Sequence, residues 1–165
     1  MKLNEIAQKT SKGTYAGVKL SKRTTQSLVD YMHDAGIPNM LDKNDLHTTL
    51  LYSRRACPNY KPDTKARYKG TPIGFDVWDN VIEGGAKEKR LVLKVDCPAL
   101  VARHKQLMTE HNATYDYPEY TPHITLSYNI GNLKPEKFPD ITKFLDTIEL
   151  QNEYSKDLDL DWQPG

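Results

Sequence analysis

Cysteine is scarce in this sequence, and its scarcity excludes two kinds of protein. The 165 residues contain only Cys57 and Cys97, which have neither the number needed for a disulfide framework nor the spacing of a metal site. Two reduced thiols are ordinary in a cytoplasmic protein. The cysteine content therefore predicts a cytoplasmic location.

Long apolar runs and an excess of one charge are also missing. No stretch approaches the roughly 18 apolar residues that span a bilayer, and the first residues, MKLNEIAQKTSKGTY, lack the apolar core of a signal peptide. Lys and Arg number 23 against 22 Asp and Glu, so the formal net charge is +1. Proteins that bind long nucleic acids usually carry a strong basic excess. We expect a soluble protein with no membrane partner and no long nucleic-acid partner, and the composition still suits a small charged ligand.

The order of predicted elements favours an α+β fold. Strand chemistry occurs at 13–20, 46–53, 73–82, 90–95, 122–130 and near 148–154, and helical patterns occur at 24–36, 98–112 and around 135–147. Gly84-Gly85 predicts a hairpin between two of the strands. No linker divides the chain, so we expect a single domain over residues 1–165, built of two similar halves.

A polar connection at 54–72 follows the second predicted strand. It contains several lysines and arginines and the single acid Asp63. Connections of this length without structure of their own are often functional or mobile. We expect it either to close over an anionic ligand or to be an ordinary solvated loop.

One six-residue pattern, H-x-T-L-x-Y, occurs twice, as HTTLLY from His47 and as HITLSY from His123. Both copies fall in predicted strands, where alternate side chains share a face. His47 and Thr49 therefore lie side by side, roughly 7 Å apart along the strand, and His123 and Thr125 do the same. Each copy presents an imidazole next to a hydroxyl.

Two such motifs facing one another can divide acid–base work between two histidines. Histidine titrates near neutral pH, so one ring can take a proton while the other gives one. Threonine hydroxyls can bind phosphate oxygens, and the set suits attack by a ribose 2′-hydroxyl on its neighbouring phosphodiester. The motifs contain no carboxylate for a metal site. The other histidines, His33, His104 and His111, lie in predicted helices, where we expect ordinary surface or core roles.

The motif pair resembles the 2H phosphoesterase superfamily, which is named for two H-x-[ST] motifs on equivalent strands. That resemblance implies an α+β fold with two pseudo-symmetric antiparallel-sheet lobes around a central cleft. The stretches KGTYAGV, DLHTTLLYS, YTPHITLSY and NEYSKDLDLDW are more closely similar to the phage anti-CBASS protein one family. Enzymes of that family degrade the cyclic oligonucleotide signals of bacterial antiphage defence, inside the infected host and without a metal.

The resemblance assigns roles to particular residues. The implied catalytic residues are the acid–base pair and the two phosphate-binding threonines: His47, Thr49, His123 and Thr125. Four further side chains are implied substrate contacts, three of them aromatic and suited to stacking on bases: Tyr15, Trp78, Glu153 and Trp162. The alternatives are ordinary packing for the aromatic residues and a solvated acid for Glu153.

The predicted activity is therefore metal-independent cleavage of 3′–5′ bonds in cyclic di- or trinucleotides, with no cofactor. A 2′,3′-cyclic phosphate forms first in this scheme and is then opened by water. The motifs leave open which histidine begins as the base. Two alternatives remain: a related enzyme acting on 2′,3′-cyclic phosphate ends of RNA, and a sponge that binds the cyclic nucleotide without cutting it.

Overall fold

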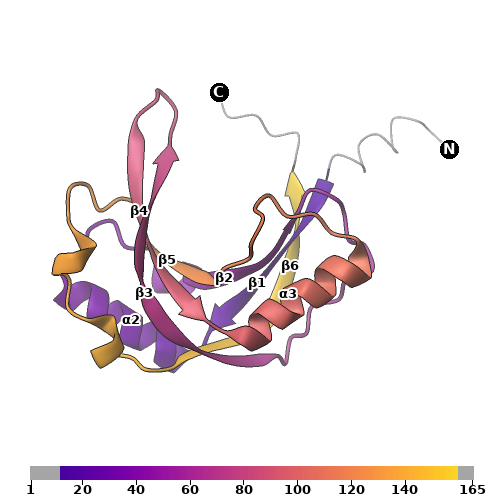
Figure 1. Ribbon diagram of the computed structural model, residues 1–165, viewed down its shortest axis with the longest axis horizontal. Coiled ribbons are helices and arrows are strands. Elements are labelled where there is room, and N and C mark those ends of the chain that lie inside the picture. The colour runs from indigo at the N-terminus through magenta and orange to yellow at the C-terminus, as the bar shows by residue number, and fades with distance from the viewer. Residues whose placement is uncertain (1–11, 160–165) are drawn as a thin grey trace.

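A six-stranded antiparallel barrel is the centre of the computed structural model, which describes residues 12–159 (Figure 1). The strand order is β1-β2-β5-β4-β3-β6, and β6 pairs back with β1. The strands are Lys12–Leu20 (β1), His47–Ser53 (β2), Arg67–Val81 (β3), Lys87–Asp96 (β4), His123–Ser127 (β5) and Ile148–Asp159 (β6). With helices Lys22–Asp34 (α2) and Pro98–His111 (α3), this confirms the α+β prediction.

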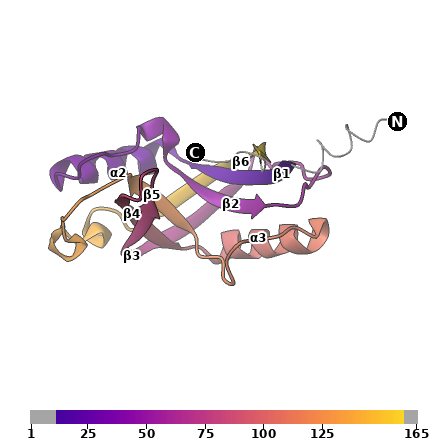
Figure 2. The same cartoon turned by 90° about the horizontal axis from the view of Figure 1, so that it is seen from above.

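Both predicted helices form, α2 two residues earlier at each end than the predicted 24–36 and α3 one residue shorter than the predicted 98–112. Ser21 caps α2, because its Oγ accepts a hydrogen bond from the backbone N–H of Thr24, and Gly36 follows the helix at φ 68°. Pro98 opens α3, and Asn112 ends it in the left-handed conformation. Figures 1 and 2 show α2 and α3 near opposite ends of the molecule. Within residues 12–159, no helix has the length and apolar character needed to cross a membrane.

Two of the predicted elements are wrong. The expected helix around 135–147 is a pair of 3₁₀ turns, Pro135–Lys137 and Ile141–Lys143. Pro139 accounts for the break, because it forces the preceding Phe138 into an extended conformation at ψ 153°. The connection predicted at 54–72 ends earlier, since Arg67 to Gly70 already pair with β6.

The motif strands β2 and β5 are direct neighbours in the barrel. Thr48 pairs with Ile124 in antiparallel orientation, and both side chains are fully buried. Buried Leu50 and Leu126 continue the same inward-facing rows. Because all six strands belong to one sheet, the expected pair of separate sheet lobes is not confirmed. The barrel core holds one face of each motif and leaves the opposite face free for chemistry.

Candidate active site

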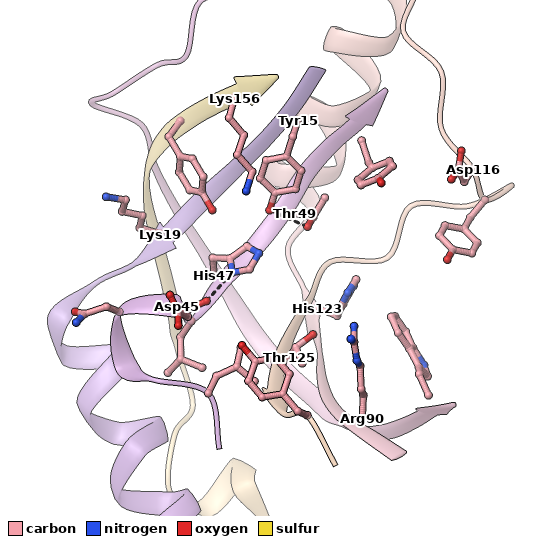
Figure 3. A pocket seen from close by; sticks show the side chains of 18 of the residues that line it. Tyr15, Lys19, Asp45, His47, Thr49, Arg90, Asp116, His123, Thr125 and Lys156 are labelled. Carbon is pink, nitrogen blue, oxygen red and sulfur yellow. Dashed lines mark hydrogen bonds between the residues drawn. The ribbon is translucent and has the colours of Figure 1, made fainter. Parts of the chain in front are cut away.

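The pairing of Thr48 with Ile124 determines how the two motifs meet. In an antiparallel pair, the residues on either side of a matched pair face one another crosswise. The histidine of each motif therefore lies across from the threonine of the other. All four side chains line one cavity of about 800 Å³ (Figure 3): His47, Thr49, His123 and Thr125.

The walls of this cavity combine aromatic rings with positive charge. The aromatic lining includes Tyr15, Tyr52, Trp78, Tyr115 and Tyr154, and the cations are Lys19, Arg90 and Lys156. In Figure 3 the two lysines lie beyond His47, while Arg90 lies on the other side, next to His123. Flat rings stack on nucleobases and cations attract phosphates. The cavity is thus suited to a nucleotide ligand.

Both histidines are held by the same kind of contact. The Nδ1–H of His47 donates a hydrogen bond of 2.6 Å to the carbonyl oxygen of Asp45, and the Nδ1–H of His123 donates one of 3.1 Å to the carbonyl of Thr121. A carbonyl can only accept, so each contact assigns the proton of the neutral ring to Nδ1. Nε2 of each ring is then the nitrogen available for proton exchange.

The two histidines differ in their surroundings. Burial lowers the pKa of His123 below its usual value; the nearby His47 adds to that effect, and the hydrogen bond to Thr121 opposes it. The ring of Trp78 lies 4.4 Å from the His123 ring, centre to centre, in an edge-on arrangement. At neutral pH, His123 is therefore present as the uncharged imidazole, the form that accepts a proton.

Tyr15 lies on the His47 side of the cavity. Its hydroxyl is 3.1 Å from Oγ1 of Thr49, and its ring centre is 6.3 Å from that of His47. Burial raises the pKa of Tyr15, so its hydroxyl stays protonated at neutral pH. The ammonium of Lys156 lies 5.1 Å from the Tyr15 ring centre. The structure thus brings Tyr15 and Trp78 to the cavity on opposite sides of the histidine pair.

Glu153 is not brought to this cavity. Its side chain is fully buried, and Arg103 donates to both carboxylate oxygens at 2.9 and 3.0 Å. The hydroxyls of Tyr60 and Tyr68 donate to the same carboxylate at 2.9 and 2.7 Å. Burial acts to raise the pKa of Glu153, but these hydrogen bonds outweigh it and hold the pKa below its ordinary value. Trp162 lies outside the described residues.

The Glu153 carboxylate also anchors the connection between β2 and β3. The backbone N–H of Asp63 donates to it at 3.1 Å, and Tyr60, also in this connection, is buried. None of residues 55–66 lines the cavity, while Arg54 forms an ion pair with Asp116 at 2.9 Å. The connection is therefore held against α3 and β6, and the lid role expected of it has no support from its position.

Tyr120 and His104 support the first motif from outside the cavity, and neither was predicted to do so. The Nδ1–H of His104 donates to the carbonyl of Leu50 at 2.8 Å, and burial lowers the pKa of this histidine. The rings of His104 and Tyr120 stack with their centres 4.1 Å apart. Tyr120 falls within the family-like stretch YTPHITLSY, which is the one sequence signal that could have pointed to it.

No carboxylate or thiol cluster accompanies the histidine pair. Over residues 12–159, no group of three or more His, Cys, Asp or Glu side chains is placed to hold a metal ion. The cavity has two carboxylates, Asp45 and Asp116, and Asp116 is paired with Arg54.

Comparison with models of protein families matches residues 12–165 to the family described as anti-CBASS protein Acb1. The chain belongs to the Acb1 family. Acb1 of Vibrio phage KVP40 is 37% identical over 163 residues, covering 98% of this chain and 97% of the relative. Acb1 of Acinetobacter phage Ac42 is 35% identical, covering 99% and 100%, and Acb1 of Enterobacteria phage T4 is 34% identical, covering 92% of each chain. These relatives confirm the predicted resemblance to the phage anti-CBASS family.

Proposed function

We propose that this chain counteracts CBASS by cutting 3′–5′ bonds of a cyclic di- or trinucleotide in the cytoplasm of an infected bacterium. The observation that carries the proposal is the crosswise arrangement of two histidines and two threonines in one aromatic, positively charged cavity. The relatives' name, anti-CBASS protein Acb1, supports the biological setting.

The first step assigns different work to the two histidines. Nε2 of His123 takes the proton of a ribose 2′-hydroxyl, because its lowered pKa keeps it uncharged. The 2′-oxygen then attacks the adjacent phosphorus, and the bond to the 5′-oxygen breaks. His47 acts as the acid and gives a proton to that departing oxygen. The product is a linear nucleotide that ends in a 2′,3′-cyclic phosphate.

The second step exchanges the two roles. His47, now uncharged, takes a proton from water, and the water oxygen attacks the cyclic phosphate. His123 returns its proton to the 2′-oxygen as that bond breaks, leaving a 3′-phosphate. Thr49 and Thr125 hold the non-bridging oxygens through both steps, because each lies across from one histidine. The crosswise symmetry supports membership of the 2H phosphoesterase superfamily, with its two H-x-[ST] motifs, and we propose that membership for this chain. We also propose that the chain forms a single domain.

Base recognition in this proposal uses the aromatic walls. Tyr15 and Trp78 stack on the two sides of the histidine pair, each contact contributing about 1–3 kcal/mol per base. Trp162 stays a candidate contact from sequence alone. Glu153 acts indirectly, by fixing β6 behind the cavity wall that Tyr154 and Lys156 form.

The direct test is incubation with 3′,3′-cyclic GMP-AMP in excess EDTA. Wild type is expected to give linear products with a terminal phosphate, read by chromatography and mass spectrometry, and His47→Ala and His123→Ala to give none. His33→Ala is the matched control, since His33 is exposed on α2 away from the cavity. A substrate with deoxyribose at the cut position should resist. Cleavage of that substrate at an equal rate would contradict the mechanism.

Other outcomes would favour the two alternatives. Recovery of intact ligand after denaturing a stable complex would indicate a sponge. Turnover of RNA 2′,3′-cyclic phosphate ends, without cleavage or binding of the cyclic dinucleotide, would indicate the RNA-end enzyme.

A further inference from the structure

Arg90 has a buried donor that no protein group satisfies. Its Nε is shielded from solvent and, within residues 12–159, has no hydrogen-bond partner. None of the ion pairs in this part of the chain involves Arg90; they are Arg54–Asp116, Lys89–Asp79 and Arg103–Glu153. A buried guanidinium donor without an acceptor is costly. Nε itself is out of a ligand's reach, but the Arg90 side chain lines the cavity, so a ligand acceptor can meet the end of the guanidinium, which no ion pair of residues 12–159 holds.

The location of Arg90 gives the ligand's position. Arg90 is on β4 opposite Trp78 of β3, and it lines both the catalytic cavity and a second cavity of about 460 Å³. Trp78, Tyr115, Tyr117 and His123 also line both cavities. The two spaces therefore adjoin along the Trp78–His123 contact. A ligand group held by Arg90 would lie beyond His123, away from Thr49 and Tyr15 (Figure 3).

The charge of the neighbouring groups favours an anion at Arg90. Asp79, which lines the second cavity, is paired with Lys89 at 2.8 Å, and Asp116 is paired with Arg54. Glu119 also lines the second cavity, but it forms no ion pair with Arg90. The guanidinium charge is thus left without a carboxylate. Guanidinium forks bind phosphate in a bidentate manner.

The two lysines on the opposite wall of the cavity do not need a ligand to satisfy their ammonium groups. Lys19 and Lys156 are exposed, and their ammonium groups lie over the rings of Tyr154 and Tyr15. Water satisfies an exposed ammonium at little cost. Arg90 is therefore the better candidate for a fixed anion contact.

We propose that Arg90 binds the phosphate of the substrate that is not being cut. The proposal rests on the proposed function, in which the other phosphate lies between His47 and His123. A cyclic dinucleotide has two phosphates, and its linear cleavage intermediate keeps both. Arg90 thereby retains that intermediate while its 2′,3′-cyclic phosphate is opened, and it selects ligands with two phosphates over ligands with one.

The first experiment compares substrates that differ in phosphate number. Arg90→Gln is expected to lower kcat/KM for 3′,3′-cyclic GMP-AMP by at least about tenfold, the loss of one charge-assisted contact. Opening of 2′,3′-cyclic AMP, which has one phosphate, should change by less than about twofold. Arg90→Lys keeps the charge without Nε and should give an intermediate loss. Arg23→Gln, the same substitution at an exposed arginine of α2 that lines neither cavity, should change neither rate.

The second experiment measures binding without cleavage. The ligand is 3′,3′-cyclic GMP-AMP with both 2′-hydroxyls replaced by hydrogen, and calorimetry measures its dissociation constant. Wild type and Arg23→Gln should bind it alike, and Arg90→Gln should bind at least about tenfold more weakly. Thermal unfolding of each variant checks that it is folded.

The outcomes separate this inference from the proposed function. Arg90-dependent binding without any cleavage by wild type would overturn the proposed function and support the Arg90 site. Cleavage that is unaffected by Arg90→Gln, or that falls equally for both substrates, would overturn the Arg90 site and leave the function intact. Absence of binding of the two-phosphate ligand to wild type would also overturn it.

Discussion

The Tyr120 hydroxyl donates a hydrogen bond of 2.6 Å to the carbonyl oxygen of Thr49, within the first H-x-T motif. The ring of Tyr120 lies nearly parallel to that of His104, at an interplanar angle of 10°. His104 bonds the next carbonyl of the same strand, that of Leu50. β1 pairs with one edge of β2 along its length, whereas pairing with β5 is limited to Thr48 and Ile124, so these two side chains add support to a strand that has a short ladder on the β5 side.

Replacing Tyr120 by Phe is expected to lower both stability and turnover. The lost hydrogen bond leaves a buried carbonyl unpaired, which costs about 1–3 kcal/mol, and the strand that carries His47 loses its support, so kcat should fall more than KM rises. The measurement is steady-state kinetics beside urea unfolding. Tyr31→Phe is the matched control, because Tyr31 also donates to a carbonyl, that of Pro139, far from the cavity. Equal turnover in the two variants would contradict a positioning role.

Thr48 and Thr49 are adjacent but should respond in opposite ways to replacement by Val. The Thr48 hydroxyl is buried without a hydrogen-bond partner in the described part of the chain, and the equivalent residue of the second motif is already Ile124. Thr48→Val should therefore leave activity intact and be neutral or stabilising by up to about 2 kcal/mol. Thr49→Val should reduce kcat by at least about tenfold, since the hydroxyl faces the cavity. Thermal unfolding and kinetics on both variants test the pair, and equal kcat losses would contradict this assignment.

The pH dependence of kcat/KM should report the burial of His123. The uncharged ring is the active base, so the rate falls as the pH drops through the pKa of His123, which lies below the usual 6.5. Trp78→Ala opens this ring to water and should move the midpoint of the acid limb upward, toward 6.5. Histidine chemical shifts followed by NMR over the same range provide a direct check. An unmoved midpoint would show that Trp78 does not shield His123.

The Glu153 cluster should make stability depend on pH in the acid range. Its pKa in the folded protein is below the ordinary value of 4.5, so its contribution is complete above pH 4.5 and is lost as the pH falls through the folded pKa. Glu153→Gln should cost about 3–5 kcal/mol at pH 7, because Arg103 is left without its partner. The difference from wild type should shrink at lower pH, as measured by urea unfolding.

Asp79→Asn is the control for that measurement. It breaks the ion pair between Asp79 and Lys89, whose side chains are 47% and 44% exposed. Such exposed pairs contribute about 0–1 kcal/mol. A loss as large as that of Glu153→Gln would show that burial is not what distinguishes the two pairs.

Much of the active site could be predicted from the sequence because strand alternation is local. The pattern H-x-T fixes which side chains share a face in each motif, and the structure puts His47, Thr49, His123 and Thr125 in one cavity. Neither motif indicates that the two strands pair with each other. That contact depends on the closure of the whole barrel, whereas the two separate lobes were expected from the resemblance to the 2H phosphoesterase superfamily.

Glu153 was expected to contact the substrate because of the family resemblance, and the structure shows why its side chain does not line the cavity. The register between β1 and β6 shifts between Val18 and Lys19, and Asn152 adopts a φ of 60°. One extra residue reverses the faces that follow it. Tyr154 therefore lines the cavity, and Glu153 points instead to Arg103. The proposed role of Arg90 could not be predicted for another reason. A single arginine at the start of an apolar strand belongs to no pattern that distinguishes a ligand-binding arginine from others.

The pairing of β1 with β6, which sets Lys12 opposite Asp159, has a consequence for biosynthesis. The ribosome makes β6 after the other five strands, so the barrel cannot close until residues 148–159 have been synthesised. Until then β1 and β3 each expose an edge, and exposed edges of nascent strands are where polypeptides join one another and aggregate. A chain truncated before Ile148 should therefore accumulate as insoluble material.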